Sequence, residues 1–357
     1  MKLIHCSDIH LDSKMEANLP PEKARERNNE LRITFSKMIS YARENGVSVI
    51  MIAGDLFDTE RVCAQTSSFV LDEIRRASGI DFLYLRGNHD ESRRAFAAEE
   101  LPENLKLFSE EWRYYEYGDV TVAGIEMNTD NCISMYDELK TDPAKTNIVM
   151  LHGQESTQPG PESVCIPSLK GKNIRYLALG HLHSFKKEKL DIDSEYCYCG
   201  CLEGRGFDEC GEKGFVLLNT ENGIIKSEFI PFAKRNLHNI PVDITGRTTE
   251  PQMRLALAEA AKNIPSKDMV KFTLEGEYTL ESQKDIPFWL KYFENSYYFV
   301  KIKDESRLYV EKESYENDVS LKGEFIRSVM ASSLSQEEKD KIICIGIRAL
   351  SGEEIEL

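Results

Sequence analysis

The sequence lacks the features that mark membrane-spanning and exported proteins. No apolar run is long enough to cross a bilayer, and residues 1–6 resemble a strand instead of a basic-then-apolar signal segment. Internal repeats and low-complexity tracts are also missing. With 41% apolar and 30% charged residues, the 357-residue chain is expected to be a globular, cytoplasmic protein of two or three units that has no contact with a membrane.

Cysteine is too scattered to form a disulfide framework. The chain has nine cysteines, an odd number, which indicates reduced thiols. The one tight group is Cys197, Cys199 and Cys201, and it lacks the second cysteine pair or nearby histidine that a zinc site needs. Because residues alternate between the two faces of a strand, all three would lie on one face. We therefore interpret the group as packing.

Positive charge is scarce as well. The formal net charge of −16 argues against a surface built to bind phosphates. Nucleic acid remains a candidate substrate, because bound divalent cations would supply positive charge where a phosphate sits.

The apolar pattern predicts an α/β protein. Strands are expected at residues 2–6, 47–53 and 80–85, with helices at 21–45 and 63–77 between them. This alternation is typical of a layered α/β sheet. Further short strands are expected at 113–117, 120–125, 148–151 and 174–179, followed by hairpin-like segments between 184 and 232.

The remaining sequence predicts a smaller α+β domain and a helical end. Residues 232–236 resemble a linker, after which a strand–helix–strand–helix–strand pattern begins. Two short helices close the chain, the second opened by the capping box Ser335–Glu338. This end would pack on the chain itself or dock on a partner. The expected domains are therefore 1–235, 236–313 and 314–357.

Polar residues collect directly after the predicted strands. Five of the seven histidines in the chain lie at such positions, beside carboxylates and an asparagine. Any one of them fits a turn, a cap or a surface, but their conjunction predicts a functional site, because loops at strand ends build the sites of α/β sheets. We expect one sheet to bring them together: Asp8, His10, Asp55, Asn88, His89, Asp90, His152, His181 and His183.

Seven of these residues are too many ligands for one cation. They offer two carboxylates, one amide oxygen and four imidazoles: Asp8, Asp55, Asn88, His10, His152, His181 and His183. A shared carboxylate can bridge two metal ions about 3.5–4 Å apart. Nitrogen and oxygen ligands without thiolate suit manganese(II), iron(II) or zinc. His89 would then be the general acid for the leaving oxygen, with Asp90 orienting its ring.

The same residues carry a family resemblance. Asp8-x-His10, Gly54-Asp55, Gly87-Asn88-His89-Asp90, His152-Gly153 and Gly180-His181-x-His183 resemble the signature motifs of calcineurin-like metallophosphoesterases. The segments 6–12, 54–58 and 203–208 are similar to SbcD-type DNA repair exonucleases, especially the YhaO-like branch. The resemblance implies a layered sandwich of mixed β-sheets flanked by helices, with a smaller DNA-capping domain.

The resemblance also implies roles for individual residues. Asp8, His10 and His183 would hold one metal ion, Asn88, His152 and His181 the other, and Asp55 would bridge them. Manganese(II) would be the usual metal. Asp58 stands where some relatives carry a histidine that orients DNA, and we take Asp58 and Arg205 as candidate substrate contacts.

Three functions are compatible with these residues. The first is a 3′–5′ DNA exonuclease for repair or recombination, with or without single-strand endonuclease activity, that acts by two-metal hydroxide attack on the phosphodiester. The second is a phosphoesterase for a small or cyclic nucleotide, which the acidic charge favours and the extra domain disfavours. The third is a scaffold subunit for an SbcC-like coiled-coil ATPase, and relatives of this type also form homodimers.

Overall fold

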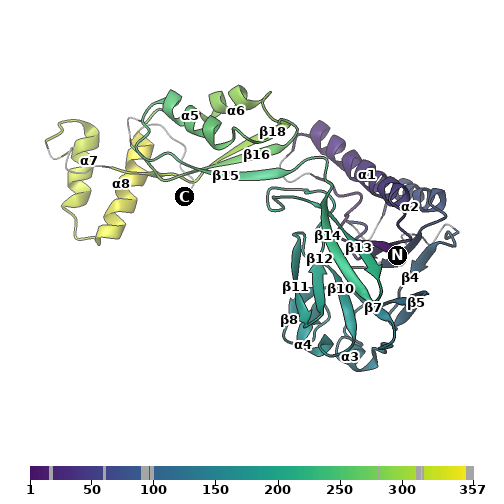
Figure 1. Cartoon of the computed structure of the whole chain (residues 1–357). Helices are drawn as coiled ribbons and strands as arrows, with labels where there is room; N and C mark the ends of the chain where they lie inside the picture. The colour runs from purple at the N-terminus through teal and green to yellow at the C-terminus, as the bar shows by residue number, and fades with distance from the viewer. Residues whose placement is uncertain are drawn as a thin grey trace. The chain divides into compact units, whose positions relative to one another are not determined.

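The computed structural model forms two compact units, Met1–Leu237 and His238–Leu357 (Figure 1). It describes residues 1–15, 19–58, 62–89, 96, 100–279, 282–310, 315 and 317–350. Each unit has hydrophobic clusters of its own.

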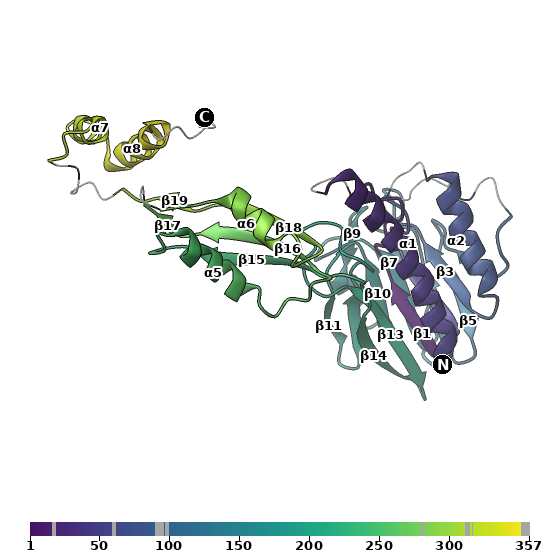
Figure 2. The ribbon, with the colours of Figure 1, turned by 90° about the horizontal axis from the view of Figure 1, so that it is seen from above.

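The first sheet of the N-terminal unit contains the predicted strand–helix alternation. Its order is β14-β13-β1-β2-β3-β4, and β1 to β4 run parallel. The strands are β1 (Lys2–Cys6), β2 (Val49–Ala53), β3 (Asp81–Leu85), β4 (Leu105–Leu107), β13 (Gly214–Glu221) and β14 (Ile224–Pro231). Two helices, α1 (Pro21–Glu44) and α2 (Ala64–Arg76), connect β1 to β2 and β2 to β3 and cover one face of the sheet (Figure 2).

A second sheet of six strands packs against the first. Its order is β11-β12-β10-β7-β6-β5, with a parallel centre and antiparallel edges. The strands are β5 (Arg113–Tyr117), β6 (Val120–Gly124), β7 (Thr146–His152), β10 (Ile174–Gly180), β11 (Lys186–Asp191) and β12 (Ser194–Tyr198). The short helices α3 (Met135–Glu138) and α4 (Ile166–Leu169) contribute to the cluster on its outer face.

Alternation along the central strands assigns side chains to the layers. In β2, Val49, Met51 and Ala53 point into the cluster between the sheets. The intervening Ile50 and Ile52 pack under the helices, as a period of two residues requires. The layers are therefore helices, sheet, sheet and short helices, which agrees with the predicted sandwich.

One expectation about this sandwich was wrong. The histidine- and aspartate-bearing loops come from two sheets, not one, because β1 to β3 lie in the first and β7 and β10 in the second. β2 and β7 are buried along their whole length, and a run that is apolar on both faces does not indicate which sheet it joins. The small parallel pair β8 (Gln154–Ser156) and β9 (Ser163–Cys165) was not predicted either.

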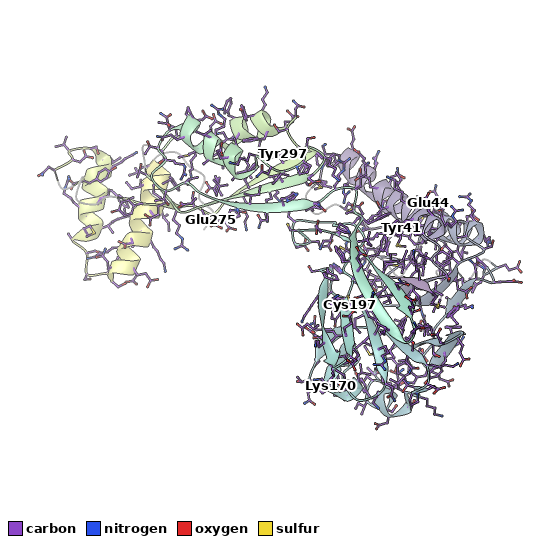
Figure 3. The ribbon with its side chains drawn as sticks, viewed as in Figure 1. Tyr41, Glu44, Lys170, Cys197, Glu275 and Tyr297 are labelled. Atoms are coloured by element: carbon purple, nitrogen blue, oxygen red, sulfur yellow. The ribbon has the colours of Figure 1, made fainter. Side chains whose placement is uncertain are left out.

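The cysteine group is packing, as expected. Cys197, labelled in Figure 3, and Cys199 lie in the cluster between the two sheets. Burial raises the pKa of Cys197 to about 12 and that of Cys199 well above its usual value. Cys201 is also fully buried, and its thiol donates a hydrogen bond to the carbonyl of His183 at 3.5 Å. Burial therefore favours the protonated thiols, which pack as small apolar side chains.

The segment that resembles a linker is held by a buried charge cluster on α1. Arg235 donates hydrogen bonds to Glu30 at 2.8 and 3.0 Å, and Arg27 forms ion pairs with Glu30 and Glu203. Arg27 and Glu30 are almost completely buried. Burial opposes ionisation of Glu30, but hydrogen bonds from Arg235, Lys234 and Arg27 outweigh it and lower the pKa of Glu30 to about 2.

We expect Glu30→Gln to lower the free energy of unfolding of the N-terminal unit by about 3 kcal/mol at pH 7, because it removes the buried carboxylate that Arg27 and Arg235 share. The lowered pKa means that Glu30 contributes its full stability above its unfolded pKa of 4.5 and loses it as the pH falls toward about 2. The difference from wild type should therefore shrink below pH 4.5 in urea unfolding curves. Glu26→Gln is the matched control, because Glu26 pairs with Arg235 from an exposed position. Equal effects of the two variants would contradict the prediction.

The C-terminal unit begins with a three-stranded sheet, β15-β16-β18, with two helices packed on it (Figure 2). Its core includes the fully buried Trp289, whose indole donates a hydrogen bond to Glu250 at 3.0 Å. The elements are β15 (Leu237–Asp243), α5 (Glu250–Ala260), β16 (Met269–Glu275), β17 (Glu277–Tyr278), α6 (Ile286–Phe293), β18 (Phe299–Asp304) and β19 (Arg307–Leu308).

The two predicted terminal helices are present. They are α7 (Leu321–Met330) and α8 (Gln336–Leu350), and the capping interaction between Ser335 and Glu338 is formed. Ile326, Ile343 and Ile347 pack between them with Val310. Other apolar side chains of this pair remain exposed, including Leu321, Leu334, Ile342 and Ile345.

Candidate metal centre

The backbone at the strand ends adopts a conformation that side chains usually avoid. Among the described residues, eight non-glycine positions have a positive φ, and four of them are Asp8, His10, Asp55 and His181. Left-handed backbone at non-glycine residues is uncommon, and strain of this kind concentrates at functional sites. The strand-end loops are therefore shaped to place side chains, at the cost of local stability.

Two glycines allow these loops to approach each other. A Cβ atom at Gly87 would lie 2.1 Å from Asp55 Oδ1, and one at Gly54 would lie 2.0 Å from His152 Nδ1. Gly54 also has a φ of +93°. Any side chain at these two positions would displace Asp55 or His152.

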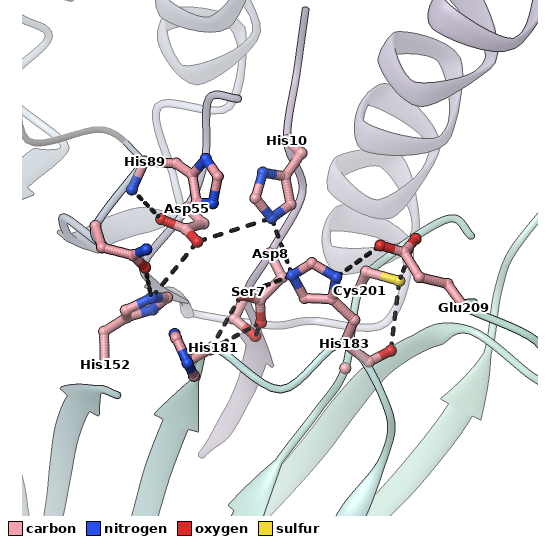
Figure 4. A network of polar contacts seen from close by, with 12 residues as sticks. Ser7, Asp8, His10, Asp55, His89, His152, His181, His183, Cys201 and Glu209 are labelled. Carbon is pink, nitrogen blue, oxygen red and sulfur yellow. Dashed lines mark hydrogen bonds and ion pairs between the residues drawn. The ribbon is translucent and has the colours of Figure 1, made fainter. Parts of the chain in front are cut away.

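Backbone donors hold the two aspartates in place. The amide of His181 donates a hydrogen bond to Asp8 Oδ1 at 3.0 Å, and the amide of His89 donates one to Asp55 Oδ1 at 3.0 Å. Both carboxylates are 1% exposed. The second oxygen of Asp55 faces two imidazoles, at 3.7 Å from His10 Nε2 and 3.5 Å from His152 Nε2 (Figure 4). This places Asp55 between the two halves of the site.

Three histidines share one arrangement of their ring nitrogens. Nδ1 of His152 lies 2.9 Å from the carbonyl of Ala53, Nδ1 of His183 lies 2.6 Å from Glu209, and Nδ1 of His10 lies 3.0 Å from Asp58. Their Nε2 atoms turn inward, toward the aspartates and toward each other. Metal-binding histidines are held in this way, with one nitrogen donating to an oxygen and the other free for the metal ion.

Burial shifts the pKa values of two of the four histidines in the direction that metal binding needs. It lowers the pKa of His10 and of His181, which favours the neutral imidazole that acts as a ligand. For His183, burial also lowers the pKa, but the hydrogen bond to Glu209 outweighs it and the pKa rises.

The structure brings all seven predicted ligands to one place. Among the described residues, three sets of side chains could each hold an ion: Asp8 with His10 and His183, Asp8 with Asp55 and His152, and His10 with Asp58 and His89. Asn88 adjoins the second set, with its Oδ1 3.0 Å from His152 Nε2, and the ring of His181 lies 5.4 Å from that of His152. Two buried carboxylates among inward-facing imidazoles match the chemistry of divalent cations.

The remaining predicted residues have different positions. His89 is exposed at the edge of the site, with its ring 5.0 Å from that of His10. Asp90 lies outside the described residues. Asp58 and Arg205, the candidate substrate contacts, form an ion pair at 2.6 Å beside His10 and His183. Glu209 was missed, because no strand end or histidine marks it in the sequence.

A pocket of about 370 Å³ opens beside Asn88, His152 and His181. Its wall includes the carboxylates Glu110, Glu126 and Glu162, together with Met127 and Asn128. Arg86, also in the wall, forms an ion pair with Glu126. The pocket wall thus carries more acidic side chains than arginines or lysines.

Residues 1–185, more than half of the chain, match the calcineurin-like phosphoesterase family, and the chain belongs to that family. It is similar to YhaO of Bacillus subtilis (strain 168), an uncharacterized metallophosphoesterase, at 30% identity over 248 residues, which cover 64% of this chain and 60% of YhaO. It is also similar to the DNA double-strand break repair protein Mre11 of Sulfurisphaera tokodaii, at 27% identity, covering 53% of this chain and 51% of that protein. The chain thus spans half to three-fifths of these relatives.

Among solved structures, the chain is similar to a dimetal phosphatase from Danio rerio, at 9% identity and a TM-score of 0.43, covering 62% of this chain and 93% of that chain. In the part of the chain that the structure describes, no helix has the length and apolar character needed to cross a membrane.

Proposed function

We propose that this metallophosphoesterase hydrolyses phosphodiester bonds in DNA, as a 3′–5′ exonuclease with two divalent cations, most favourably manganese(II). The observation that supports it most directly is the shared arrangement of His10, His152 and His183, whose Nδ1 atoms each lie 2.6–3.0 Å from an oxygen while their Nε2 atoms converge on aspartates. The similarity to a DNA double-strand break repair protein supports DNA as the substrate.

The predicted ligands form two metal-binding positions that share one carboxylate. Asp8, His10 and His183 would hold one ion, and Asn88, His152 and His181 the other, with Asp55 between them. When bound, a pair of divalent cations lowers the pKa of a water molecule and stabilises the charge of a phosphoryl group. The protein supplies fixed ligands, because the amides of His89 and His181 donate hydrogen bonds to the two aspartates.

His89 is the proposed general acid. Its imidazole is exposed beside His10, whereas its backbone amide is committed to Asp55. The side chain is therefore free to donate a proton to the leaving 3′ oxygen while the main chain supports the metal site.

The proposal is tested with purified full-length protein and linear duplex and single-stranded DNA labelled at the 3′ or the 5′ end. We expect release of nucleotides from the 3′ end with Mn²⁺ and none with a chelator. A chromogenic phosphodiester, bis-p-nitrophenyl phosphate, is assayed in parallel. Hydrolysis of the chromogenic diester with all DNA left intact would reject DNA as the substrate and retain the phosphoesterase.

The pocket beside the site favours a second candidate, a phosphoesterase for a small or cyclic nucleotide. Its carboxylates Glu110 and Glu162 repel a polyanionic strand but can accept hydrogen bonds from the amino groups of a single base, whereas Glu126 is paired with Arg86. Cyclic mononucleotides and dinucleotides therefore belong in the substrate panel, and faster turnover of these than of DNA would establish this candidate instead.

A coiled-coil ATPase is the partner that we propose for the terminal helices. Leu321, Ile342 and Ile345 expose apolar surface on the pair α7–α8, and Leu334 does so in the connection between them; apolar side chains on a helix are what a partner helix packs against. Co-purification of such an ATPase with the full chain, and its loss on removal of residues 314–357, is the expected result. Unchanged recovery after truncation would eliminate this docking role.

A further inference from the structure

Arg205 connects the two carboxylates that contact ligand histidines. Its Nη1 donates a hydrogen bond to Asp58 Oδ1 at 2.6 Å. Its Nε and Nη2 donate to Glu209 Oε1 at 3.2 and 2.9 Å, and its backbone amide donates to Glu209 Oε2 at 2.7 Å. The Arg205 side chain is only 18% exposed. The mostly buried guanidinium group thus donates hydrogen bonds to two different carboxylates, Asp58 and Glu209.

Each of these carboxylates contacts a different histidine. The oxygen of Asp58 that accepts from Arg205 also lies 3.0 Å from His10 Nδ1. The oxygen of Glu209 that accepts from Arg205 also lies 2.6 Å from His183 Nδ1 (Figure 4). On the other side of the two rings, His10 Nε2 and His183 Nε2 are 3.2 Å apart. One arginine therefore sits behind both histidines of one proposed metal position.

The geometry gives this arrangement a physical consequence. A carboxylate on Nδ1 fixes the proton there, leaves Nε2 unprotonated and sets the ring orientation. A carboxylate alone can rotate, but a guanidinium fork restricts its plane, because the donors of arginine are rigidly spaced. Arg205 applies this restriction to Asp58 and Glu209 at the same time.

We propose that Arg205 is a positioning residue that orients His10 and His183 for one metal ion, acting through the two carboxylates that it joins. This inference rests on the proposed metal site and deepens it. Under this inference, Arg205 and Asp58 hold the metal ligands in place and do not contact the substrate.

The contacts disfavour a substrate role for the same side chain. All three guanidinium nitrogens already donate to Asp58 or Glu209. Only two of the five N–H groups of the guanidinium remain for a phosphate, and the two carboxylates beside them would repel it.

The test is calorimetric titration of Mn²⁺ into metal-free full-length protein, with diester hydrolysis measured over a range of Mn²⁺ concentrations. Wild type should bind two ions. Arg205→Gln should weaken one of the two sites by about 10–100-fold and leave the other unchanged, since supporting residues of a metal site have effects of this size. Its kcat should fall at low Mn²⁺ and recover at high Mn²⁺, with KM for the diester unaltered. Arg205→Lys should recover part of the affinity, because it keeps the charge without the fork.

Arg32→Gln is the matched control. Arg32 is 22% exposed and pairs with Asp12 at 2.9 Å, so its loss breaks a comparable ion pair that contacts no ligand histidine. Asp58→Asn removes only the carboxylate that connects Arg205 to His10, so it tests the effect on His10 alone. Thermal unfolding of each metal-free variant shows whether it is folded. Unchanged Mn²⁺ affinity in folded Arg205→Gln and Asp58→Asn, with a raised KM, would overturn the inference in favour of substrate contact. Failure of the wild type to bind Mn²⁺ would instead reject the proposed function itself.

Discussion

Replacing His89 with alanine is expected to reduce kcat on DNA by about 10²–10⁴-fold, the usual contribution of a general acid. The reduction should be much smaller on bis-p-nitrophenyl phosphate, because nitrophenolate departs without a proton. Mn²⁺ affinity should be unchanged, since the hydrogen bond from residue 89 to Asp55 comes from the backbone amide, which alanine retains. Initial rates on both substrates at saturating Mn²⁺ provide the measurement.

The comparison of the two substrates separates a proton donor from a ligand. Equal losses on DNA and on the activated diester, together with weaker Mn²⁺ binding, would make His89 part of the metal site, which its proximity to His10 and Asp58 makes a real alternative. His238→Ala is the control, because His238 is bound to Asp268 in the C-terminal unit. No loss on either substrate would remove His89 from the chemistry altogether.

The candidate site was largely predictable because its residues follow buried strands. Parallel strands end at the same edge of a sheet, so polar residues after β1, β2 and β3 had to meet. Asp8, Asp55 and Asn88 could therefore be grouped before any coordinates were known. The pattern could not show that His152 and His181 come from a second sheet, because β7 and β10 are apolar on both faces.

The residues that hold the ligand histidines in place were not predictable from the local sequence pattern. Glu209 reaches His183 through a loop that follows β12, and Arg205 is joined to Asp58 across 147 positions of sequence. Neither lies at a strand end or at helical spacing, so only the tertiary structure brings them together. The same holds for the cluster around Glu30, whose partner Arg235 lies 205 positions away in a segment that resembles a linker.

Asp55→Asn is expected to reduce activity by about 10³-fold or more, because the position between both halves of the site loses its charge. A factor of 10³ corresponds to about 4 kcal/mol of transition-state stabilisation, which is within the several kcal/mol that metal ions supply. Metal content per chain should fall from two ions to at most one, measured by elemental analysis after equilibration with Mn²⁺. Retention of two ions with full activity would reject the bridging role.

The same variant should change stability with opposite sign in the two metal states. Asp8 and Asp55 are both 1% exposed, and without cations their charges are buried close to each other at a cost to the folded state. Asp55→Asn removes one charge, so in a chelator it should melt above wild type. With Mn²⁺ at 100 times its dissociation constant, wild type gains about 2.7 kcal/mol per site by linkage, and the variant loses most of that gain. Asp81→Asn, at the opposite end of β3 and paired with Lys106, should leave the Mn²⁺-dependent gain intact. A variant that is less stable than wild type even in the chelator would show that Asp55 stabilises the fold independently of metal.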